Sequence, residues 1–394
     1  MKRRHLLGGL GAILGVSALT WPDKAARAGS KDSRFVFVTL RGGMDGLAAV
    51  PAVGDPAYVS ARGAIALPVD KTLPLDGIFA LHPGLAALYP MYQQGEMACV
   101  HATGLSFQTR SHFDAQDLLE SGGGTPQSQH SGWLNRSLSK DCAPGYAVAI
   151  SRTVPLLARG DNPVTAVDPL RRKDARPSIL TRLDALYQQD SVLATALMDG
   201  LASRDKVRTA QGDVAQTMMK GDRNSRFSQS IEVVGRMMAD PAGPRVAALE
   251  STGWDTHAAQ GTVSGNLANR FKRLAGALID LKRGLGPAWK ETVVVVASEF
   301  GRTVHANGTK GTDHGTAGVV LLLGGAVAGG QVRADWPGLA KPKLFQGRDL
   351  RTTTDIRSIF KGVLHDHMGL TRSDLDRLVF PGSREVSAMH GLVV

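Results

Sequence analysis

The stretch Thr292-Val293-Val294-Val295-Val296-Ala297 decides the fold of this chain. Its residues are β-branched or apolar without interruption, which predicts a strand that is buried on both faces. Such a strand is typical of a mainly parallel sheet that helices cover on both sides. The polar residues Ser298-Glu299-Phe300-Gly301-Arg302 follow it directly. Because a carboxylate beside a buried strand needs a partner or a cavity, this end of the strand is a candidate functional site.

Other apolar stretches alternate along the chain with segments that have helical spacing. This alternation predicts an α/β fold, a three-layer sandwich with a mostly parallel, doubly wound sheet. We also expect a helical insertion at about residues 165–240 that caps the functional site. The predicted strands are 34–40, 96–101, 146–150, 245–249 and 318–323, and the predicted helices are 113–121, 261–283 and 355–367.

The N-terminus has the order of residues that an export signal requires. Arg3 and Arg4 precede an apolar stretch from Gly8 to Thr20, and Ala26-Arg27-Ala28 offers a cleavage site. The paired arginines indicate the twin-arginine route, with the twin-arginine translocation machinery as a partner. An N-terminal membrane anchor is the alternative, but a spanning helix needs about 20 apolar residues. We therefore expect cleavage of residues 1–28, location in the periplasm or outside the cell, and no membrane span afterwards.

Composition indicates a large globular domain with a surplus of positive charge. Residues 34–394 are enough for a single α/β domain with a sizeable core. The chain has 46 Lys+Arg and 35 Asp+Glu, a formal net charge of +11. Residues 1–28 hold five basic residues and one acid, so the expected mature chain has 41 basic and 34 acidic residues, a balance of +7, which favours an anionic small-molecule or polymer substrate. The basic residues are scattered along the chain, which argues against nucleic-acid binding. No haem-attachment, iron–sulfur or dinucleotide motif supports a redox enzyme.

The two cysteines leave two interpretations open. Cys99 and Cys142 could form a disulfide in an oxidising compartment. Cys99 also lies in the apolar run Met97–Val100, where a buried free thiol is expected. Since the chain has no Cys-rich motif, any metal must bind oxygen and nitrogen ligands.

Polar residues gather on loops beside the predicted strands. Asp255 and His257 flank Thr256, so both side chains project to the same side of an extended loop. Asp45 lies in a glycine-rich turn, where an aspartate also serves local hydrogen bonds. Glu299 needs a ligand or a plain salt bridge to a residue such as Arg302. Together these clusters predict a divalent-metal site with the candidate ligands Asp45, Asp255, His257, Glu299, Asp313 and His314.

The motifs LRGGMDGL, RSHFDAQDLLE, GWLNR, GWDTHAAQ, SEFGRT and GTDHG, in this order, resemble those of the DUF1501 family. The resemblance runs from about residue 34 to the C-terminus. The family's domain is in turn remotely similar to the alkaline phosphatase/sulfatase superfamily, whose members hydrolyse phosphate or sulfate esters with two divalent cations. The resemblance implies an exported, metal-dependent hydrolase of such esters. The alternative is an exported binding or assembly protein that keeps the alkaline phosphatase-like fold without its chemistry.

The resemblance also implies a set of ligands. One cation would bind to Asp45 and Glu299, and a second to Asp255, His257 and His314. Such carboxylate-rich ligation is better suited to manganese, calcium or magnesium than to zinc.

Two features depart from the superfamily pattern, and one of them is that its Asp-xxx-His spacing is contracted here to Asp255-Thr256-His257. A histidine is expected after the carboxylate at 299, and this chain has Phe300 there. His112 or His305 would have to replace it, or the site would hold a single metal.

The catalytic residues implied by the resemblance are Ser111 and Arg302. Ser111, at the start of a predicted helix, would be the nucleophile, and an ordinary N-cap is the alternative. Arg302, together with Arg110, would hold the equatorial oxygens of the substrate by bidentate hydrogen bonds.

Overall fold

The computed structural model describes residues 32–139, 142, 145–151, 153–167, 177–187, 189–211 and 223–394. The predicted export signal, residues 1–28, lies outside these ranges. Within them, no helix combines the length and the apolar character that crossing a membrane would require.

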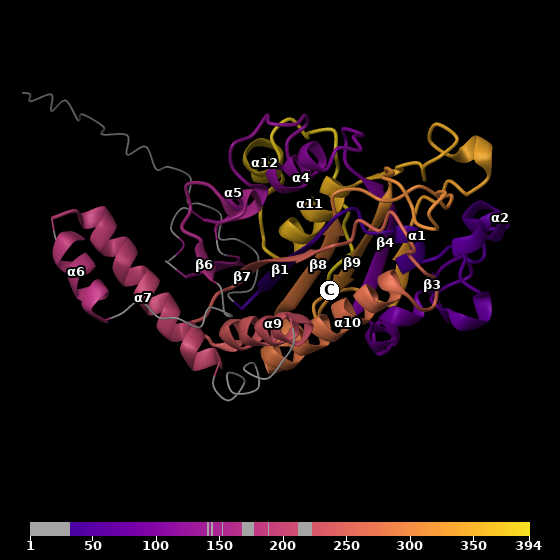
Figure 1. Cartoon of the computed structure of the whole chain (residues 1–394). Coiled ribbons are helices and arrows are strands. Elements are labelled where there is room, and N and C mark those ends of the chain that lie inside the picture. The colour runs from indigo at the N-terminus through magenta and orange to yellow at the C-terminus, as the bar shows by residue number, and fades with distance from the viewer. Residues whose placement is uncertain are drawn as a thin grey trace, which may run out of the picture.

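A nine-stranded sheet forms the middle layer of the molecule (Figure 1). Its order is β10-β4-β9-β8-β1-β7-β5-β6, and β11 pairs with β4 outside this path. β9 runs antiparallel to both of its neighbours, whereas the other pairs in this sheet are parallel. The strands are β1 (Arg34–Arg41), β4 (Met97–Gly104), β5 (Ala147–Ile150), β6 (Thr165–Val167), β7 (Val246–Thr252), β8 (Thr292–Ser298), β9 (Gly318–Leu323), β10 (Gln331–Arg333) and β11 (Thr354–Asp355).

Helices cover both faces of this sheet, which confirms the predicted three-layer α/β fold (Figure 1). One face packs against α9 and α10, and the other against α4, α5 and α11. The helices are α1 (Gly46–Ala49), α2 (Tyr58–Arg62), α3 (Tyr89–Gln93), α4 (His112–Ser121), α5 (Trp133–Ser137), α6 (Pro177–Tyr187), α7 (Ser191–Gln211), α9 (Arg223–Ala239), α10 (Asn266–Leu285), α11 (Ile356–Asp366) and α12 (Arg372–Asp374). A small hairpin of β2 (Leu73–Pro74) and β3 (Ala80–Leu81) stands apart from the main sheet.

The alternation of side chains along β1 builds the two halves of the core. Val36 and Val38 belong to the cluster that contains α9 and α10, and Phe35 and Phe37 to the cluster that contains α11. Both clusters are apolar because the strand lies in the centre of the sheet, between β7 and β8. β8, the predicted central strand, is likewise buried from Thr292 to Ala297.

The predicted strands and helices are present, with small shifts at their ends. The largest shift is at α10, which begins at Asn266 and not at residue 261. Gly261 and Gly265 both have positive φ, at 81° and 110°, and such a backbone cannot continue a right-handed helix. The amphipathic face of α10 is as predicted, with Leu267, Phe271 and Leu274 buried.

The helix-rich segment near residues 165–240 forms α6, α7 and α9. α9 packs on α10, whereas α6 and α7 project beyond the β6 edge of the sheet (Figure 1). The main contacts of α7 are with α9 and β6, and those of α6 are with α7. The expected cap over the site is therefore not formed by these two helices.

Cys99 lies fully buried on β4 as a free thiol, which decides between the two interpretations of this residue. Burial raises the pKa of the thiol to about 12. A thiol of this kind packs as a small apolar side chain.

Candidate metal centre

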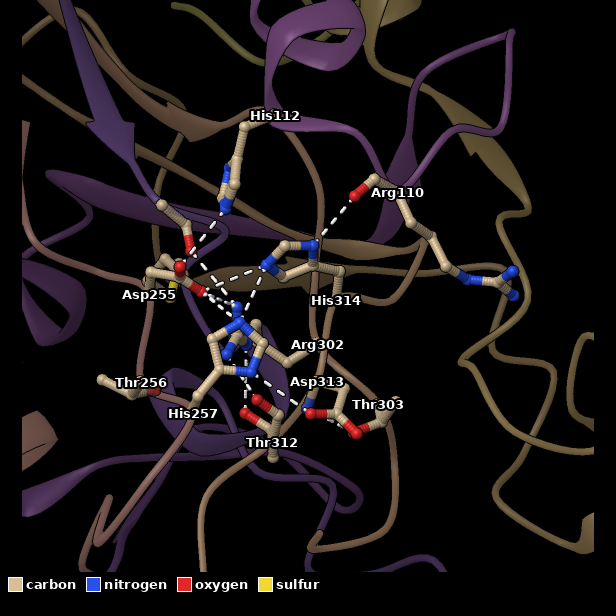
Figure 2. Close-up of polar contacts among 12 residues, drawn as sticks. Arg110, His112, Asp255, Thr256, His257, Arg302, Thr303, Thr312, Asp313 and His314 are labelled. Carbon is tan, nitrogen blue, oxygen red and sulfur yellow. Dashed lines mark hydrogen bonds and ion pairs between the residues drawn. The ribbon is translucent and has the colours of Figure 1, made fainter. Parts of the chain in front are cut away.

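The carboxyl ends of neighbouring strands bring distant polar residues together. β7 and β8 flank β1 in parallel, so the loops that follow them meet at one edge of the sheet. Asp255 and His257 come from the loop after β7, and His314 from the loop that leads to β9. His112, the first residue of α4, completes a cluster of four side chains that face one another (Figure 2). Ligand atoms of His112, Asp255 and His314 all lie within 4.8 Å of one another.

Three of these ligand atoms form a tight triangle. Nε2 of His257 lies 3.0 Å from Nε2 of His314 and 2.9 Å from Oδ1 of Asp255. Oδ1 of Asp255 lies 3.2 Å from Nε2 of His314. Two ligands at about 2.0–2.1 Å from a tetrahedral zinc ion are roughly 3.3 Å apart. The triangle therefore has nearly the spacing that the ligands of one cation require.

His112 supplies a fourth donor atom that has no hydrogen-bond partner. Its Nε2 is buried, and the nearest acidic oxygen is Oδ2 of Asp255 at 3.4 Å. A buried imidazole nitrogen without a partner costs free energy. Its direction, toward the carboxylate of the triangle, makes it a further candidate ligand.

The remaining ring nitrogen of each histidine contacts an oxygen acceptor. Nδ1 of His112 lies 2.9 Å from Oε1 of Glu299, and Nδ1 of His257 lies 3.2 Å from Oδ1 of Asp313. Nδ1 of His314 lies 2.8 Å from the carbonyl oxygen of Arg110. Carboxylates and carbonyls only accept, so a neutral ring that donates from Nδ1 presents a lone pair at Nε2. Metal-binding histidines have this arrangement almost always. Nε2 of His257 and Nε2 of His314 also lie next to an acceptor, Oδ1 of Asp255, so an ion pair with a protonated ring is the alternative at these two positions.

This tautomer assignment makes the contact between His257 and His314 informative. Two neutral rings that are protonated at Nδ1 have only lone pairs to offer at a distance of 3.0 Å. Such a contact is repulsive unless a cation or a proton lies between the two nitrogens. Burial lowers the pKa of His314 and the charge of Arg302 lowers it further, whereas the Arg110 carbonyl and the charge of Asp255 act in the opposite direction without reversing the shift. Protonation of this ring is thus disfavoured, and a metal ion fits the contact better.

Glu299 is buried and holds the ring of His112. Its Oε1 accepts from Nδ1 of His112, from the backbone N–H of Gly42 at 2.8 Å and from Nε2 of Gln116 at 3.0 Å. Its Oε2 accepts from the hydroxyl of Ser298 at 2.9 Å. Burial alone would raise the pKa of the Glu299 carboxyl, but these hydrogen bonds outweigh burial and lower it. Glu299, predicted as a ligand, is thus used on His112 instead of facing the triangle.

Asp313 contacts Nδ1 of His257 in the same way as Glu299 contacts Nδ1 of His112. Its Oδ1 also accepts from Nδ2 of Asn307 at 3.0 Å. This hydrogen bond from Asn307 lowers the pKa of the Asp313 carboxyl, and the contact with His257 adds to the effect. Asp313 therefore lies behind His257, with half of its side chain exposed to solvent.

Asp45 is not brought to the cluster. Its Oδ2 accepts from Arg62 at 2.6 Å and from Gln260 at 2.7 Å, and its Oδ1 caps α1 through the N–H of Ala48. Asp45 thus forms a local hydrogen bond, which is the alternative to metal binding that its position in a turn suggested. A buried ion pair with Arg62 comes in addition.

Arg302 pairs with Asp255, and Glu299 has other partners, so the plain salt bridge between residues 299 and 302 is absent. Nη1 of Arg302 donates to Oδ1 of Asp255 at 2.6 Å, and Nε of Arg302 donates to Oγ1 of Thr312 at 3.1 Å. The guanidinium is buried, and its remaining contacts are the carbonyls of Thr312 and Gly42. Burial would raise the pKa of the Asp255 carboxyl, but the hydrogen bond and the charge of Arg302 lower it.

The side chain of Arg110 points away from the cluster (Figure 2). Its guanidinium donates to Oδ2 of Asp349 at 2.7 Å and to Gln346. Arg110 contacts the site through its backbone carbonyl and not through its guanidinium. The predicted substrate clamp is therefore not present in the form expected for either arginine.

Ser111 is the N-cap of α4, and its Oγ accepts from the N–H of Asp114 at 3.4 Å. The capping role that the sequence offered for Ser111 is thus present in the structure. Among the described residues, no acceptor takes a hydrogen bond from the hydroxyl, so the proton of Ser111 is not committed.

His112 is a candidate ligand that the sequence indicated only as a substitute for the histidine missing at position 300. The signal for His112 was the missing histidine at position 300. The ring of Phe300 packs against the ring of His112, at a centroid distance of 4.8 Å, and against the ring of His314, at 5.0 Å. His305, the other substitute, is exposed at the surface. The aromatic ring at 300 thus supports two histidines in the place where the pattern expected one ligand.

A second group of residues, His365, Asp366 and His390, also has three ligand atoms within 4.8 Å. Nδ1 of His390 already pairs with Asp366 at 2.9 Å, and Nδ1 of His365 contacts the carbonyl of Leu370. No buried, unpartnered nitrogen points into this group, in contrast to the cluster around Asp255.

The fold and the donor set define a three-layer α/β protein with a histidine-rich candidate metal centre. The chain belongs to the family described as "Protein of unknown function (DUF1501)", whose model matches residues 32–379. This match confirms the resemblance that the motifs indicated. No curated protein matches the chain in sequence.

Several solved structures are similar to the chain at low identity. The lipoteichoic acid synthase LtaP from Listeria monocytogenes is 10% identical, with a TM-score of 0.41, and the match covers 91% of this chain and 76% of that one. The periplasmic domain of EcEptC from Escherichia coli, in complex with Zn, is 13% identical, with a TM-score of 0.34 and coverage of 89% and 87%. The phosphonate monoester hydrolase of Agrobacterium radiobacter is 11% identical, with a TM-score of 0.34 and coverage of 86% and 74%.

Proposed function

We propose that the protein is a metal-dependent hydrolase of phosphate or sulfate esters. One observation carries the proposal: Nε2 of His257, Nε2 of His314 and Oδ1 of Asp255 form a triangle, Nε2 of His112 lies 3.4 Å from the other oxygen of Asp255, and each imidazole contacts an acceptor at Nδ1. In this assignment His112, Asp255, His257 and His314 bind the cation, and Glu299 and Asp313 orient two of the histidines.

The donor set favours zinc over calcium or magnesium. Calcium and magnesium prefer oxygen ligands, whereas imidazole is suited to zinc and other first-row transition metals. Three nitrogens and one carboxylate are therefore the reverse of the carboxylate-rich set expected from the sequence. The oxygens of Asp45 and Glu299 already accept hydrogen bonds from protein donors, which favours one cation over two.

A bound divalent cation supplies Lewis-acid polarisation of an ester oxygen. Around it, Arg302 keeps Asp255 ionised and oriented, which is a positioning role and not the predicted substrate clamp. Ser111 is the proposed nucleophile, because its uncommitted hydroxyl lies at the N-terminus of α4, where backbone N–H groups favour an anion. Overall, water adds across the ester bond and releases an alcohol and the free phosphate or sulfate.

The open position of the centre bears on the size of the substrate. The side chains of Asp255 and His257 are 40% and 44% exposed. An ester group on a large molecule can therefore approach without entering a deep cavity. We propose that this happens after export by the twin-arginine route, in the periplasm or outside the cell.

A second candidate is an exported binding protein that holds a metal without turning over an ester. The observation that favours it is the internal engagement of Arg302, which leaves no described arginine free to hold the equatorial oxygens of a substrate at the centre.

Ester hydrolysis by the zinc-supplemented mature protein separates the two candidates. The substrates are p-nitrophenyl phosphate and p-nitrophenyl sulfate, and the variants are Asp255→Asn and, as a matched control, Asp70→Asn on the exposed surface. We expect hydrolysis of at least one ester by the parent and the control, and at least about a hundredfold loss in Asp255→Asn. A parent that binds zinc but releases no nitrophenol would favour the binding protein.

A further inference from the structure

An open groove of about 220 Å³ lies at the end of the strand whose following loop carries Asp255. It lies between the end of β7 and the N-terminal half of α10. Trp254 lines it, and the next residue in the chain is the proposed ligand Asp255. We call it the arginine groove, and its lining residues are Glu250, Ser251, Thr252, Trp254, Arg270, Arg273 and Leu274.

Positive charge dominates this groove. The guanidinium of Arg270 contacts neutral acceptors, Oδ1 of Asn266 at 3.1 Å and the carbonyl of Thr252 at 3.4 Å. Arg273 lies one helical turn further along α10, and the helix has no acidic residue from 266 to 279. Glu250, the acid in the lining, is paired with Arg41 at 2.8 Å.

The two arginines are close enough to repel each other. Burial lowers the pKa of Arg270, and the neighbouring charge of Arg273 lowers it further. Keeping two like charges together without a bridging carboxylate is costly, and an anion between them would relieve the cost.

The backbone below Arg270 is shaped to admit its guanidinium. Gly253 has a φ of 90°, and a Cβ atom added there would lie 2.4 Å from Nη1 of Arg270. The positive φ favours glycine, and a side chain at this position would displace the flexible end of Arg270. The position of Arg270 in the groove is therefore defined by the loop that also carries Asp255.

We propose that the arginine groove binds a second phosphate or sulfate group, so that the substrate of the centre is a polyanion. This rests on the proposed ester hydrolysis and specifies its substrate class. Guanidinium groups bind tetrahedral oxyanions by paired, charge-assisted hydrogen bonds. A chain with repeated anionic groups can then lie along the groove and reach the centre with a neighbouring ester. Phosphate polymers and sulfated polysaccharides share this chemistry.

Fluorescence anisotropy with labelled probes tests the groove. The probes are fluorescein-labelled dextran sulfate and inorganic polyphosphate, with neutral dextran as the reference. The variant Arg270→Gln/Arg273→Gln removes both charges, and Lys341→Gln/Lys343→Gln removes two charges from the exposed segment η6 (Lys341–Lys343). Arg270→Lys/Arg273→Lys keeps the charge without the guanidinium geometry.

We expect the Gln variant to bind dextran sulfate or polyphosphate at least about tenfold more weakly than the parent. The Lys variant should lie between the two, and the η6 variant should bind as the parent does. The probe that loses more affinity identifies whether sulfate or phosphate is preferred. Equal affinity of the parent and the Gln variant, or an equal loss in the η6 variant, would overturn the proposal.

The design separates failure of the groove from failure of the proposed function. The Gln variant should keep the metal content of the parent and its rate on a small p-nitrophenyl ester. Probe binding is also measured on a His257→Ala/His314→Ala protein, which lacks two proposed ligands but keeps both arginines. Probe binding that persists there supports the groove even where no ester is hydrolysed.

Discussion

At the scale of single residues, the acceptor on each Nδ1 decides what the histidine cluster can do. Glu299, Asp313 and the carbonyl of Arg110 assign the proton to Nδ1 in all three rings. In that tautomer the three Nε2 atoms and the Asp255 carboxylate can bind the proposed cation, while Arg302 donates to the carboxylate. The chemistry of the centre thus follows from residues that do not themselves face the triangle.

Replacing Glu299 by Gln tests this dependence. The variant removes the charge that orients His112, and we expect zinc to bind about 10- to 100-fold more weakly. Competition with a chromophoric chelator measures the affinity, and thermal unfolding checks that the protein is folded. Glu291→Gln, an exposed acid of the same type, is the control. Unchanged affinity in Glu299→Gln would exclude the proposed role of Glu299 in orienting His112.

A histidine far from the centre makes stability depend on pH. His101 is buried, its Nε2 lies 3.0 Å from the carbonyl of Val50, and its ring stacks on Phe79. Burial lowers its pKa to about 4, below the value of about 6.5 for an unfolded chain. The unfolded state therefore binds a proton first as pH falls. Its contribution to stability is complete above pH 6.5 and is lost as pH falls towards about 4.

We expect the parent to lose up to roughly 3 kcal/mol of unfolding free energy through this group between pH 6.5 and 4. Urea unfolding with a chelator present measures it, so that loss of metal does not contribute. The free energy of unfolding of His101→Gln should depend less steeply on pH than that of the parent. His305→Gln, which changes an exposed histidine, should show the same pH dependence as the parent. Parallel curves for His101→Gln and the parent would show that His101 is not the titrating group.

At the scale of elements, the strands could be predicted from the sequence and the centre only in part. The run Thr292–Ala297 is so uniformly apolar that its burial and the parallel sheet follow from it. The loops after β7 and β8 could be assigned to one edge of that sheet for the same reason. The pairing of His112 with Glu299 could not, because it joins the start of α4 to a residue far along the chain through tertiary packing alone.

The same limit explains why some predicted ligands have protein partners in the structure instead of facing the cluster. A carboxylate in a turn has the same sequence pattern whether it binds a cation or an arginine. Only the fold places Arg62 against Asp45. Likewise, the position of α6 and α7 beyond the β6 edge depends on contacts that periodicity does not contain.

Helix α4 allows the two roles of Ser111 to be separated. Ser111→Ala removes both the cap and the hydroxyl, and we expect a loss of about 1 kcal/mol of stability together with loss of hydrolysis. Ser111→Asn keeps a good cap without a nucleophile, so its stability should be close to that of the parent while hydrolysis is lost. Chemical denaturation and the p-nitrophenyl assay measure the two effects. Full activity in the Asn variant would assign Ser111 to capping alone.

At the scale of the whole molecule, the net charge of +7 expected after removal of residues 1–28, the open centre and the arginine groove favour the same kind of ligand. A positively charged surface raises the local concentration of anions, and salt screens this effect. The sheet brings the centre and the groove to the end of β7, so that one extended polyanion can contact both. The predicted export signal at residues 1–28 would bring the folded protein to such polymers outside the cytoplasm.

The metal content of the mature protein tests the central claim most directly. Elemental analysis is made on the parent purified without chelator, on His257→Ala/His314→Ala and on the control His305→Ala. We predict close to one equivalent of zinc or another transition metal in the parent and the control, and none in the double variant. A folded parent that holds no metal, even after addition of zinc and dialysis, would contradict the assignment of the cluster as a metal centre.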